Sequence, residues 1–459
     1  MKSILFCLLI ITCFIACKKN TTNPSFSSRA TNAGPFADTV TLPIVIDADM
    51  ELSNDILYIL DGYTYVINGA ALVVAEGARV EAMPHSALVV TRGSKLYAQG
   101  TETNPIVFTS IQTNPLPGDW HGILLLGDAP VNEQNPDFES VPGFGFPAGV
   151  PDGIDVTYGA ALNEHDDSGV LQYIRIEYGG KALIGSFNDE NELDGLTCAG
   201  VGDNTVLDYI EVAHSDGDAF QFFGGTVNAK HLFAYEQRKD GFDFDLGYTG
   251  HIQYAVSAFN QNTSYTFPCG IESHSVNGSS HGGIYPPVLY THPKISNMTV
   301  VGLHDSLNAA IYIDSGRGAW FDKSSNYEIR NSIFMGFPNG VTFGDVTSQS
   351  FVNKFRNNII HAYNSPVNPA SLFATVQGNN NTTYTGYSAN NTVQLTNPFN
   401  YLWPDFRPYT TSPALTAGTS FTGLTGYPGF FDSTGYRGAF NVYTSNGTYW
   451  LAGWARTNY

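Results

Sequence analysis

A repeat of short, similar segments occupies residues 170–363 and constrains the fold more than any other feature of the sequence. In each segment a residue that is usually apolar is followed two positions later by Tyr, His or Asn. The segments are VLQYIRIEYGG (170–180), VLDYIEVAHSD (206–216), NAKHLFAYEQ (228–237), HIQYAVSAFN (251–260), KISNMTVVG (294–302), EIRNSIFMG (328–336) and KFRNNIIHAY (354–363). The shortest spacing is 22 to 23 residues. A unit of this length cannot bury an apolar face alone, so its copies are expected to stack into a solenoid.

A second pattern lies between these segments: Gly or Ala, an apolar residue, any residue, then usually another apolar residue. It occurs as GLTC (195–198), AFQF (219–222), GFDF (241–244), GIES (270–273), AIYI (310–313) and GVTF (340–343). The alternation predicts short strands with one buried face, so each repeat holds at least two strands. In the column that contains Asn297, Asn331 and Asn357, we expect a side-chain ladder along a turn, because Asn tolerates unusual backbone angles.

Composition agrees with an all-β chain. Gly (47 residues), Tyr (26) and Phe (30) are abundant, and charged residues make up only 14%. Segments 128–168, 181–193 and 261–293 break the repeat and are expected to form loop insertions. We place the β-solenoid at residues 41–365 and a C-terminal cap, covering the open edge of the last rung, at residues 366–459.

The N-terminus predicts export and lipidation. Residues 1–16 combine a charged start with an apolar run too short to span a bilayer. The run closes on Ala16-Cys17 and so resembles a bacterial lipobox, which implies cleavage before Cys17 and lipids on that residue. Residues 17–40 then read as a lipidated N-terminus and flexible tether. An ordinary secretory signal with a chance Cys is the alternative.

The net charge of −20 limits the class of partner. It argues against nucleic acid, which requires clustered Lys and Arg, and more weakly against a polyanionic sugar. Together with the lipobox it favours a location in the cell envelope. Lys18, rather than Asp, follows Cys17, and this favours the outer membrane.

Aspartates recur on neighbouring rungs. Asp194, Asp218 and Asp240 each precede the Gly or Ala of the second pattern, so they are expected to form a ladder with rungs about 4.8 Å apart. Asp243 is placed one rung below Glu272 on the outward side. Asp216 and Asp245 flank the same patch.

Such stacked carboxylates repel one another by roughly a few kcal/mol when partly desolvated, and three interpretations follow. The patch is a solvated acidic face, or it is a Ca²⁺ site formed by Asp216, Asp218, Asp240, Asp243 and Asp245, since Ca²⁺ favours oxygen ligands. The third interpretation is a catalytic carboxylate pair of Asp218 and Asp243.

Other candidate residues give weaker signals. His274, His281 and His292 match no standard zinc spacing. Cys198 and Cys269 are expected to be free thiols, because about three rungs separate them. Trp120 is predicted to plug the core. Aromatic residues such as Phe223, Tyr248 and Tyr312 could stack on sugar rings, although packing in the core is the commoner outcome.

The chain resembles the bacterial extracytoplasmic right-handed parallel β-helix lipoproteins, a family of unassigned activity. The matching text includes NPIVFTS with GDWHGILLLGDAPVN, the stretch from AGVGDNTVLDYIEVAHSDGD to KDGFDFDLGYTGHIQYAV, and the closing YRGAFN with YWLAGW. The resemblance covers about residues 60–459. It implies a right-handed parallel β-helix, and it implies no particular reaction.

We therefore expect an envelope-anchored β-helix lipoprotein that binds a glycan or another partner without catalysis. A polysaccharide lyase or glycoside hydrolase acting at the acidic face is the first alternative. A structural envelope scaffold is the second.

Overall fold

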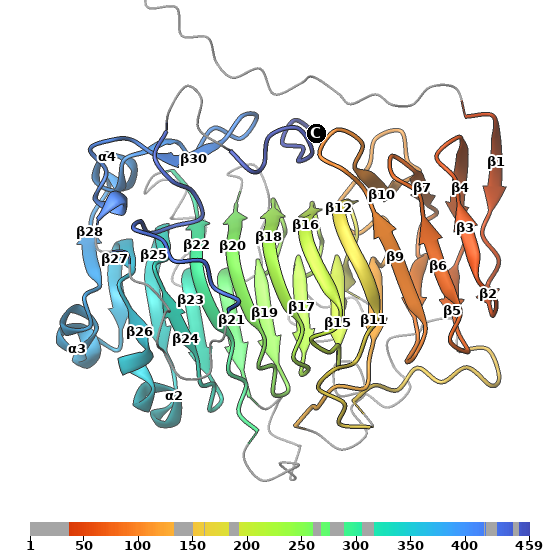
Figure 1. The fold of residues 1–459 in the computed structure, drawn as a ribbon. Helices are drawn as coiled ribbons and strands as arrows, with labels where there is room; N and C mark the ends of the chain where they lie inside the picture. Colours follow the sequence, from red (N-terminus) through yellow and green to blue (C-terminus); the bar gives the residue numbers. More distant parts are fainter. Residues whose placement is uncertain are drawn as a thin grey trace, which may run out of the picture.

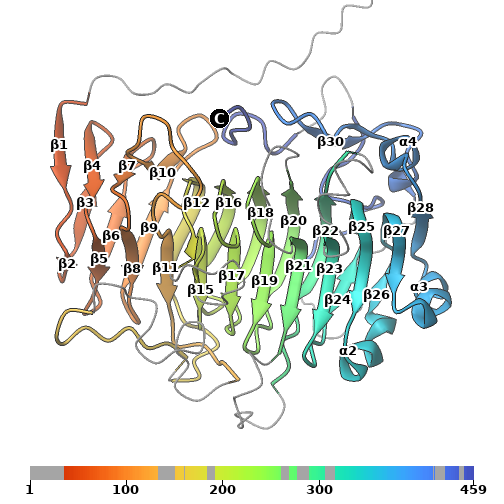
Figure 2. The same cartoon turned by 180° about the vertical axis from the view of Figure 1, so that it is seen from behind.

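The computed structural model describes residues 36–132, 150–159, 161–182, 192–259, 268–275, 289–304, 316–416, 418, 429–443 and 449–459. The predicted parallel β-helix is confirmed, because the strands of successive rungs pair in parallel into three long ladders, which we call faces 1, 2 and 3. The strands stand side by side along the length of the molecule, as seen from both sides (Figures 1 and 2).

Face 1 consists of β1 (Asp38–Thr41), β4 (Ile56–Leu60), β7 (Arg79–Ala82), β10 (Ile106–Ser110), the second halves of β12 (Gly169–Glu177), β16 (Val206–Ala213), β18 (Asn228–Tyr235), β20 (His251–Ala258) and β22 (Lys294–Val301), then β25 (Ile333–Phe343), β27 (Ile359–Asn368) and β28 (Thr382–Thr385). Face 2 consists of β2 (Val45–Ile46), β5 (Tyr63–Val66), β8 (Ala87–Val90), β11 (Ile123–Leu126), β15 (Leu196–Ala199), β17 (Phe220–Phe223), β19 (Phe242–Asp245), β21 (Cys269–His274), β23 (Arg317–Asp322) and the ends of β25 and β27. Face 3 consists of β3 (Met50–Leu52), β6 (Ala71–Val74), β9 (Lys95–Gln99), the first halves of β12, β16, β18, β20 and β22, then β24 (Glu328–Arg330) and β26 (Phe355–Arg356).

The remaining elements are short. They are the antiparallel pairs β13 (Lys181–Ala182) with β14 (Glu192–Leu193) and β29 (Leu395–Asn397) with β30 (Asp405–Pro408), the helices α2 (Val346–Ser350), α3 (Phe373–Gly378) and α4 (Ala389–Val393), and the 3-10 turns η3 (Val352–Lys354), η4 (Ala370–Leu372) and η5 (Pro413–Leu415). No helix among the described residues is long and apolar enough to cross a membrane.

The corner between faces 3 and 1 is the residue column predicted from the sequence. Asn297, Asn331 and Asn357 have φ values of 58°, 51° and 57°, as expected for a left-handed turn. Upstream, the same column carries Tyr173, Tyr209, His231 and Tyr254, also with positive φ. These rings stack on one another, with centroids 4.3, 4.2 and 5.2 Å apart in chain order. Stacking offsets the strain that a bulky side chain meets in this conformation.

The inside of the solenoid is filled by the residues predicted to point inward. Phe220 stacks on Phe242 with ring centroids 5.0 Å apart, and Phe222 stacks on Phe244 at 5.2 Å. Trp120 is fully buried in the same core, as predicted. Cys198 and Cys269 are buried free thiols, also as predicted. Tyr248 packs in the core as well, so its ring is not available for a sugar.

One predicted rung is wrong. The strand that follows β21 on face 2 is β23, so Glu272 pairs with Trp320 and not with Tyr312. Residues 310–313 lie outside the described residues. The segment Gly318-Ala319-Trp320-Phe321 fits the same pattern, and the insertion before it concealed the register.

The region after the repeat both extends and covers the β-helix. The face 1 ladder runs from Asp38 to Thr385, so it is longer than the predicted range 41–365 at both ends. From α4 onward, the described residues lie along the outside of face 1, back to β12 and β10 (Figure 1). There they bury the apolar outward side chains of the later rungs, among them Phe233, Val256 and Ile333, against Phe406 and Trp454. The predicted cap therefore covers a side of the solenoid as well as its last rung.

Candidate functional site

The aspartate ladder predicted from the sequence is present, and its carboxylates bind the backbone. Asp194 accepts a hydrogen bond from the backbone N–H of Asp218, at 3.0 Å. Asp218 accepts one from Asp240 N–H at 2.6 Å, and Asp240 accepts one from Cys269 N–H. Each carboxylate thus ties its own rung to the next. Burial raises the pKa of Asp218 to about 6 and also raises the pKa of Asp240.

The other three predicted aspartates lie in different surroundings. Asp216 forms ion pairs with Arg238 and with Lys181, the latter at 3.5 Å. Asp243 and Asp245 point outward from β19 and are nearly buried, with Asp243 between Gln221 and Glu272 in the register of face 2. Among the described residues, no group of three or more His, Cys, Asp or Glu side chains could hold a metal ion.

Calcium at this patch therefore stays a prediction. If Ca²⁺ bound at Asp216, Asp218, Asp240, Asp243 and Asp245, millimolar CaCl₂ would raise the melting temperature of the full chain, because a ligand that binds only the folded state stabilises it. An unchanged melting temperature in calcium and in chelator would remove the calcium interpretation. The predicted histidines add no support: His274 contacts Glu272 at 3.2 Å, His292 is half-buried, and His281 lies outside the described residues.

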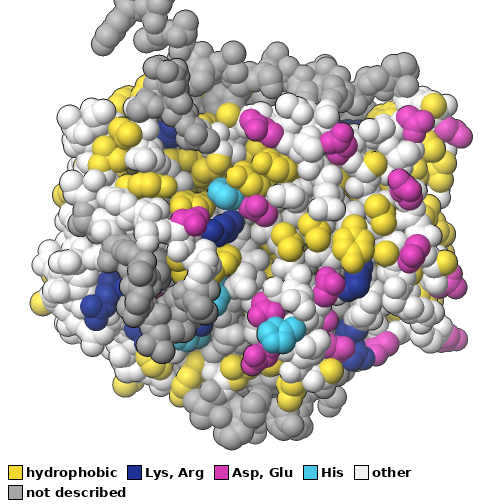
Figure 3. All heavy atoms as spheres, viewed as in Figure 1, with side chains coloured by type: hydrophobic (Ala, Val, Ile, Leu, Met, Phe, Trp, Pro, Cys, Tyr) yellow, Lys and Arg dark blue, Asp and Glu magenta, His cyan; other side chains and the backbone are white. Residues whose placement is uncertain are grey.

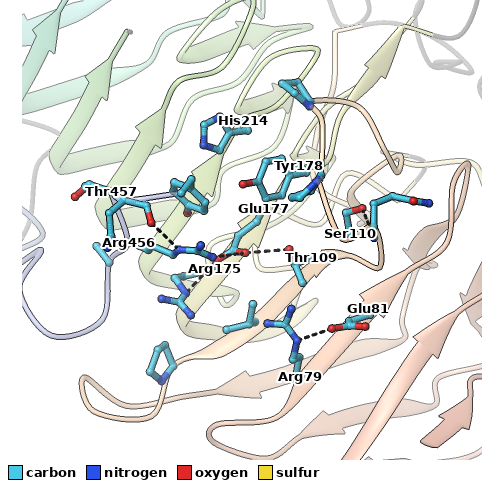
Figure 4. Close-up of a pocket in the computed structure, with 18 of the residues that line it drawn as sticks. Arg79, Glu81, Thr109, Ser110, Arg175, Glu177, Tyr178, His214, Arg456 and Thr457 are labelled. Carbon is cyan, nitrogen blue, oxygen red and sulfur yellow. Dashed lines mark hydrogen bonds and ion pairs between the residues drawn. The ribbon is translucent and has the colours of Figure 1, made fainter. Parts of the chain in front are cut away.

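A second site, which sequence reasoning missed, lies on the outside of face 1. Here a groove with a volume of about 1140 Å³ separates the early rungs from the last residues of the chain (Figure 4). Its floor carries charged side chains at outward positions of β7 and β12 and Thr109 on β10 between them, where the later rungs of face 1 carry mainly apolar side chains. Its lining includes Arg79, Glu81, Thr109, Arg175, Glu177, Tyr178, His214, Trp403, Arg456 and Tyr459.

Register explains why these side chains converge. Arg79 pairs with Val107, which pairs with Arg175, which pairs with Glu211 on β16. The next residue of this column is Phe233, which belongs to the apolar cluster under the C-terminal segment. The groove therefore ends beyond the β16 rung, where Glu211 is followed in this column by Phe233 of the apolar cluster.

Two carboxyl groups are buried beside this groove. Glu177 accepts a hydrogen bond from the Thr109 hydroxyl at 2.9 Å and lies 3.4 Å from both Arg175 and Arg456. Glu211 accepts hydrogen bonds from Arg456 N–H at 2.8 Å and from the Tyr459 hydroxyl at 3.0 Å. Burial raises the pKa of Glu211 to about 8, so its carboxyl group is mostly protonated at neutral pH.

His214 completes the wall of the groove. Its ring stacks on Tyr178, with centroids 4.9 Å apart, and meets the edge of Tyr459 at 4.5 Å. Burial lowers its pKa to about 4, so the imidazole is neutral at pH 7. The buried Arg175 Nε and Glu177 Oε1 face each other at 3.4 Å as an ion pair, whereas His214 Nε2 is buried and forms no hydrogen bond within the described part of the chain. Buried polar atoms in this state are uncommon and call for an explanation.

Comparison with known proteins gives the family. The model described as "Pectate-lyase like beta helix domain" matches residues 44–400, which is more than half of the chain. The chain belongs to this family. Its fold is therefore a right-handed parallel β-helix, as predicted. No curated protein matches the chain. A solved structure, the Dettilon tailspike protein (gp208), is similar at 11% identity with a TM-score of 0.21, and the match covers 76% of this chain and 61% of that one.

The groove gives this pectate-lyase-like β-helix hydrogen-bond donors, acceptors and an aromatic wall in one place. Trp403, at its rim, is 37% exposed, so its ring could stack on a sugar. On the face seen in Figure 3, acidic side chains lie mainly over the first rungs.

One signal in the sequence could have revealed the groove. Arg79-Val80-Glu81 and Arg175-Ile176-Glu177 place an Arg and a Glu at alternate positions of otherwise apolar strands. In a strand, alternate residues share a face, so the same charged pair recurs on one outer surface. Nothing in the C-terminal sequence indicated that Arg456 and Tyr459 would lie against it.

Proposed function

We propose that this protein is a cell-envelope lipoprotein that binds a glycan, without cleaving it, in the groove on face 1. The observation that carries the proposal is a groove of about 1140 Å³ in which the Arg175–Glu177 ion pair lies beside the buried His214 Nε2, an atom with no hydrogen bond within the described part of the chain. Sugar hydroxyl groups both donate and accept hydrogen bonds, so a sugar ring could bind the ion pair and the imidazole together. The fold of the family suits a protein that binds or acts on polysaccharide.

Anchoring at Cys17 is part of this proposal and rests on the sequence alone, because residues 1–35 lie outside the described residues. An outer-membrane location has the same basis. Mass spectrometry of the native protein would detect the lipid on Cys17, and an unmodified Cys17 would leave the protein without this anchor.

Binding to a glycan array tests the site. We expect Arg175→Ala and Glu177→Gln each to weaken the binding of the selected glycan by about tenfold or more, because each removes a polar group that the ligand would pair. Arg330→Ala and Glu328→Gln are the matched control, since this Arg–Glu pair has the same spacing in β24 on face 3, with Nε and Oε1 2.8 Å apart. Equal losses in both pairs, or no glycan bound, would contradict the proposal.

Glycoside hydrolysis in the same groove is the second candidate, and one observation favours it. Burial keeps Glu211 mostly protonated at neutral pH. Its neighbour Glu177 forms ion pairs with Arg175 and Arg456. Glycoside hydrolysis uses two carboxyl groups, one of which is a protonated acid. Turnover on a glycan panel, abolished in Glu211→Gln, would favour the enzyme, and binding without turnover would favour the non-catalytic role.

The acidic face of face 2 remains the other place proposed for catalysis, with Asp218 and Asp243. Asp218 is 3% exposed and its carboxylate accepts the backbone N–H of Asp240. Loss of turnover in Asp218→Ala and Asp243→Ala, and not in Glu211→Gln, would place the reaction there. A protein that neither binds nor cleaves any glycan would be left as an envelope scaffold.

A further inference from the structure

The last described residues, 453–459, cover the groove, and we call them the strap. The strap contributes contacts to both buried carboxyl groups. Arg456 donates its backbone N–H to Glu211 and its guanidinium lies 3.4 Å from Glu177 (Figure 4). Tyr459 donates its hydroxyl to the other oxygen of Glu211. Glu177 and Glu211 are at most 1% exposed with the strap in place.

The strap also occupies the aromatic wall. The Tyr459 ring meets the stacked pair of Tyr178 and His214 edge-on, with interplanar angles of 88° to both. The Arg456 guanidinium lies over the same Tyr459 ring, 4.4 Å from its centroid. The Tyr459 ring with its hydroxyl group, together with the Arg456 guanidinium over it, therefore fills the part of the groove where a sugar would bind.

Side-chain contacts, including the buried Trp454 edge-on against Tyr173 and Tyr209, hold the strap to the rest of the molecule. No residue of it belongs to a strand of the three described faces. Thr457 donates its hydroxyl to Leu402 O at 3.0 Å, and its carbonyl accepts a long hydrogen bond of 3.4 Å from Tyr235. A segment held by side-chain contacts, outside the ladder hydrogen bonds, can open while the ladder stays intact.

The charged side chains beneath the strap determine which class of ligand can bind in its place. Arg79 lies 2.8 Å from Glu81, and Arg175 lies 3.4 Å from Glu177, so each Arg already has a carboxylate. Glu211 has its hydrogen bonds from the strap alone among the described residues. A ligand that displaces the strap must therefore bring hydrogen-bond donors to Glu211 and a positive charge to Glu177 in place of Arg456.

We propose that the groove binds a sugar chain bearing free amino groups, and that this chain takes the place of the strap. The inference rests on the proposed glycan-binding function and names the class of glycan. A protonated amino group replaces the Arg456 guanidinium, and hydroxyl groups replace the Tyr459 hydroxyl. A sugar acid would bring its carboxylate towards Glu177 instead, which repels it.

Calorimetric titration of the full chain with oligomers of glucosamine, glucose and galacturonate tests the class. We expect the glucosamine oligomer to bind about tenfold or more tightly than the galacturonate oligomer. We expect Tyr459→Ala to tighten glucosamine binding by a further factor of about ten, because the competing strap is weakened. Tyr387→Ala, which removes a 63%-exposed tyrosine elsewhere, should leave both affinities unchanged.

Amide hydrogen exchange tests whether the strap opens, independently of which sugar binds. In the full chain without sugar, the Arg456 amide should exchange about a hundredfold or more faster than the Ile210 amide in β16. Equal exchange rates, or a Tyr459→Ala affinity equal to that of the wild type, would overturn the displacement of the strap. Tighter binding of galacturonate, or equal binding of all three oligomers, would overturn the class of sugar and leave glycan binding intact. Binding of none of them would overturn the proposed function as well.

Discussion

Replacing Phe244 by alanine is expected to lower the free energy of unfolding by about 3 to 5 kcal/mol. Phe244 is fully buried inside the solenoid, where its ring stacks on Phe222 at 5.2 Å and on Tyr248 at 5.1 Å. Alanine removes the apolar surface that the ring buries and leaves a cavity between two rungs. Urea unfolding followed by circular dichroism measures the change.

Phe244→Leu is the matched control, because leucine keeps most of the volume and should retain most of the stability. A loss of less than about 1 kcal/mol in Phe244→Ala would mean that the neighbouring rings close the cavity, or that Phe244 is not an inward residue. Either result would contradict the packing of this column.

The inward columns could be predicted from the sequence because alternation in a strand leaves only two choices of face. Phe242 and Phe244 therefore had to lie on one side and Asp243 on the other, whatever the register between rungs. The corner column was predictable for a similar reason. Asn297, Asn331 and Asn357 are residues that tolerate left-handed backbone, and the aligned Tyr173 identified the same corner in an earlier rung.

Register between distant rungs was harder to predict. Two segments, 310–313 and 318–321, fit the strand pattern after β21, and the loop between rungs has no fixed length. Only the observed pairing of Glu272 with Trp320 decides between them. A repeat with long insertions specifies which residues face inward more firmly than it specifies which rungs are neighbours.

The groove could not be predicted because its two sides are far apart in the sequence. Arg175 and Glu177 lie in a repeat, but Arg456 and Tyr459 lie in a segment without one. Their position depends on the apolar outward surface of face 1, which draws the C-terminal segment back along the solenoid. The sequence-based prediction assumed that this surface faced solvent, so the C-terminal region was expected to cover only the last rung.

The aspartate ladder was predicted correctly in position, but its chemistry depends on atoms that a sequence pattern does not place. Stacking of Asp194, Asp218 and Asp240 suggested repulsion that a cation would offset. The structure shows that backbone N–H groups of the next rung donate to these carboxylates. Such donors stabilise the ionised form, yet burial still raises the pKa of Asp218.

The second large effect expected is a gain in stability when Asp218 is replaced by asparagine at neutral pH. The pKa of Asp218 is raised from 3.8 to about 6 in the folded protein, mainly by burial. As the pH rises from about 4 to about 6, the unfolded chain ionises first, so the folded state loses up to about 3 kcal/mol. The asparagine side chain resembles the protonated carboxyl group and keeps an oxygen that accepts the Asp240 N–H. Asp218→Asn should therefore match the wild type near pH 4 and exceed it by about 3 kcal/mol near pH 7.

Unfolding by urea at a series of pH values measures this difference between the two proteins. The exposed Asp61→Asn is the control for the loss of one negative charge, and it should change the free energy of unfolding by less than about 0.5 kcal/mol. A difference between Asp218→Asn and the wild type that stays constant from pH 4 to pH 7 would show that Asp218 ionises without a penalty. The ladder would then stabilise the ionised carboxylate fully, and burial would not be the main determinant of the pKa of Asp218.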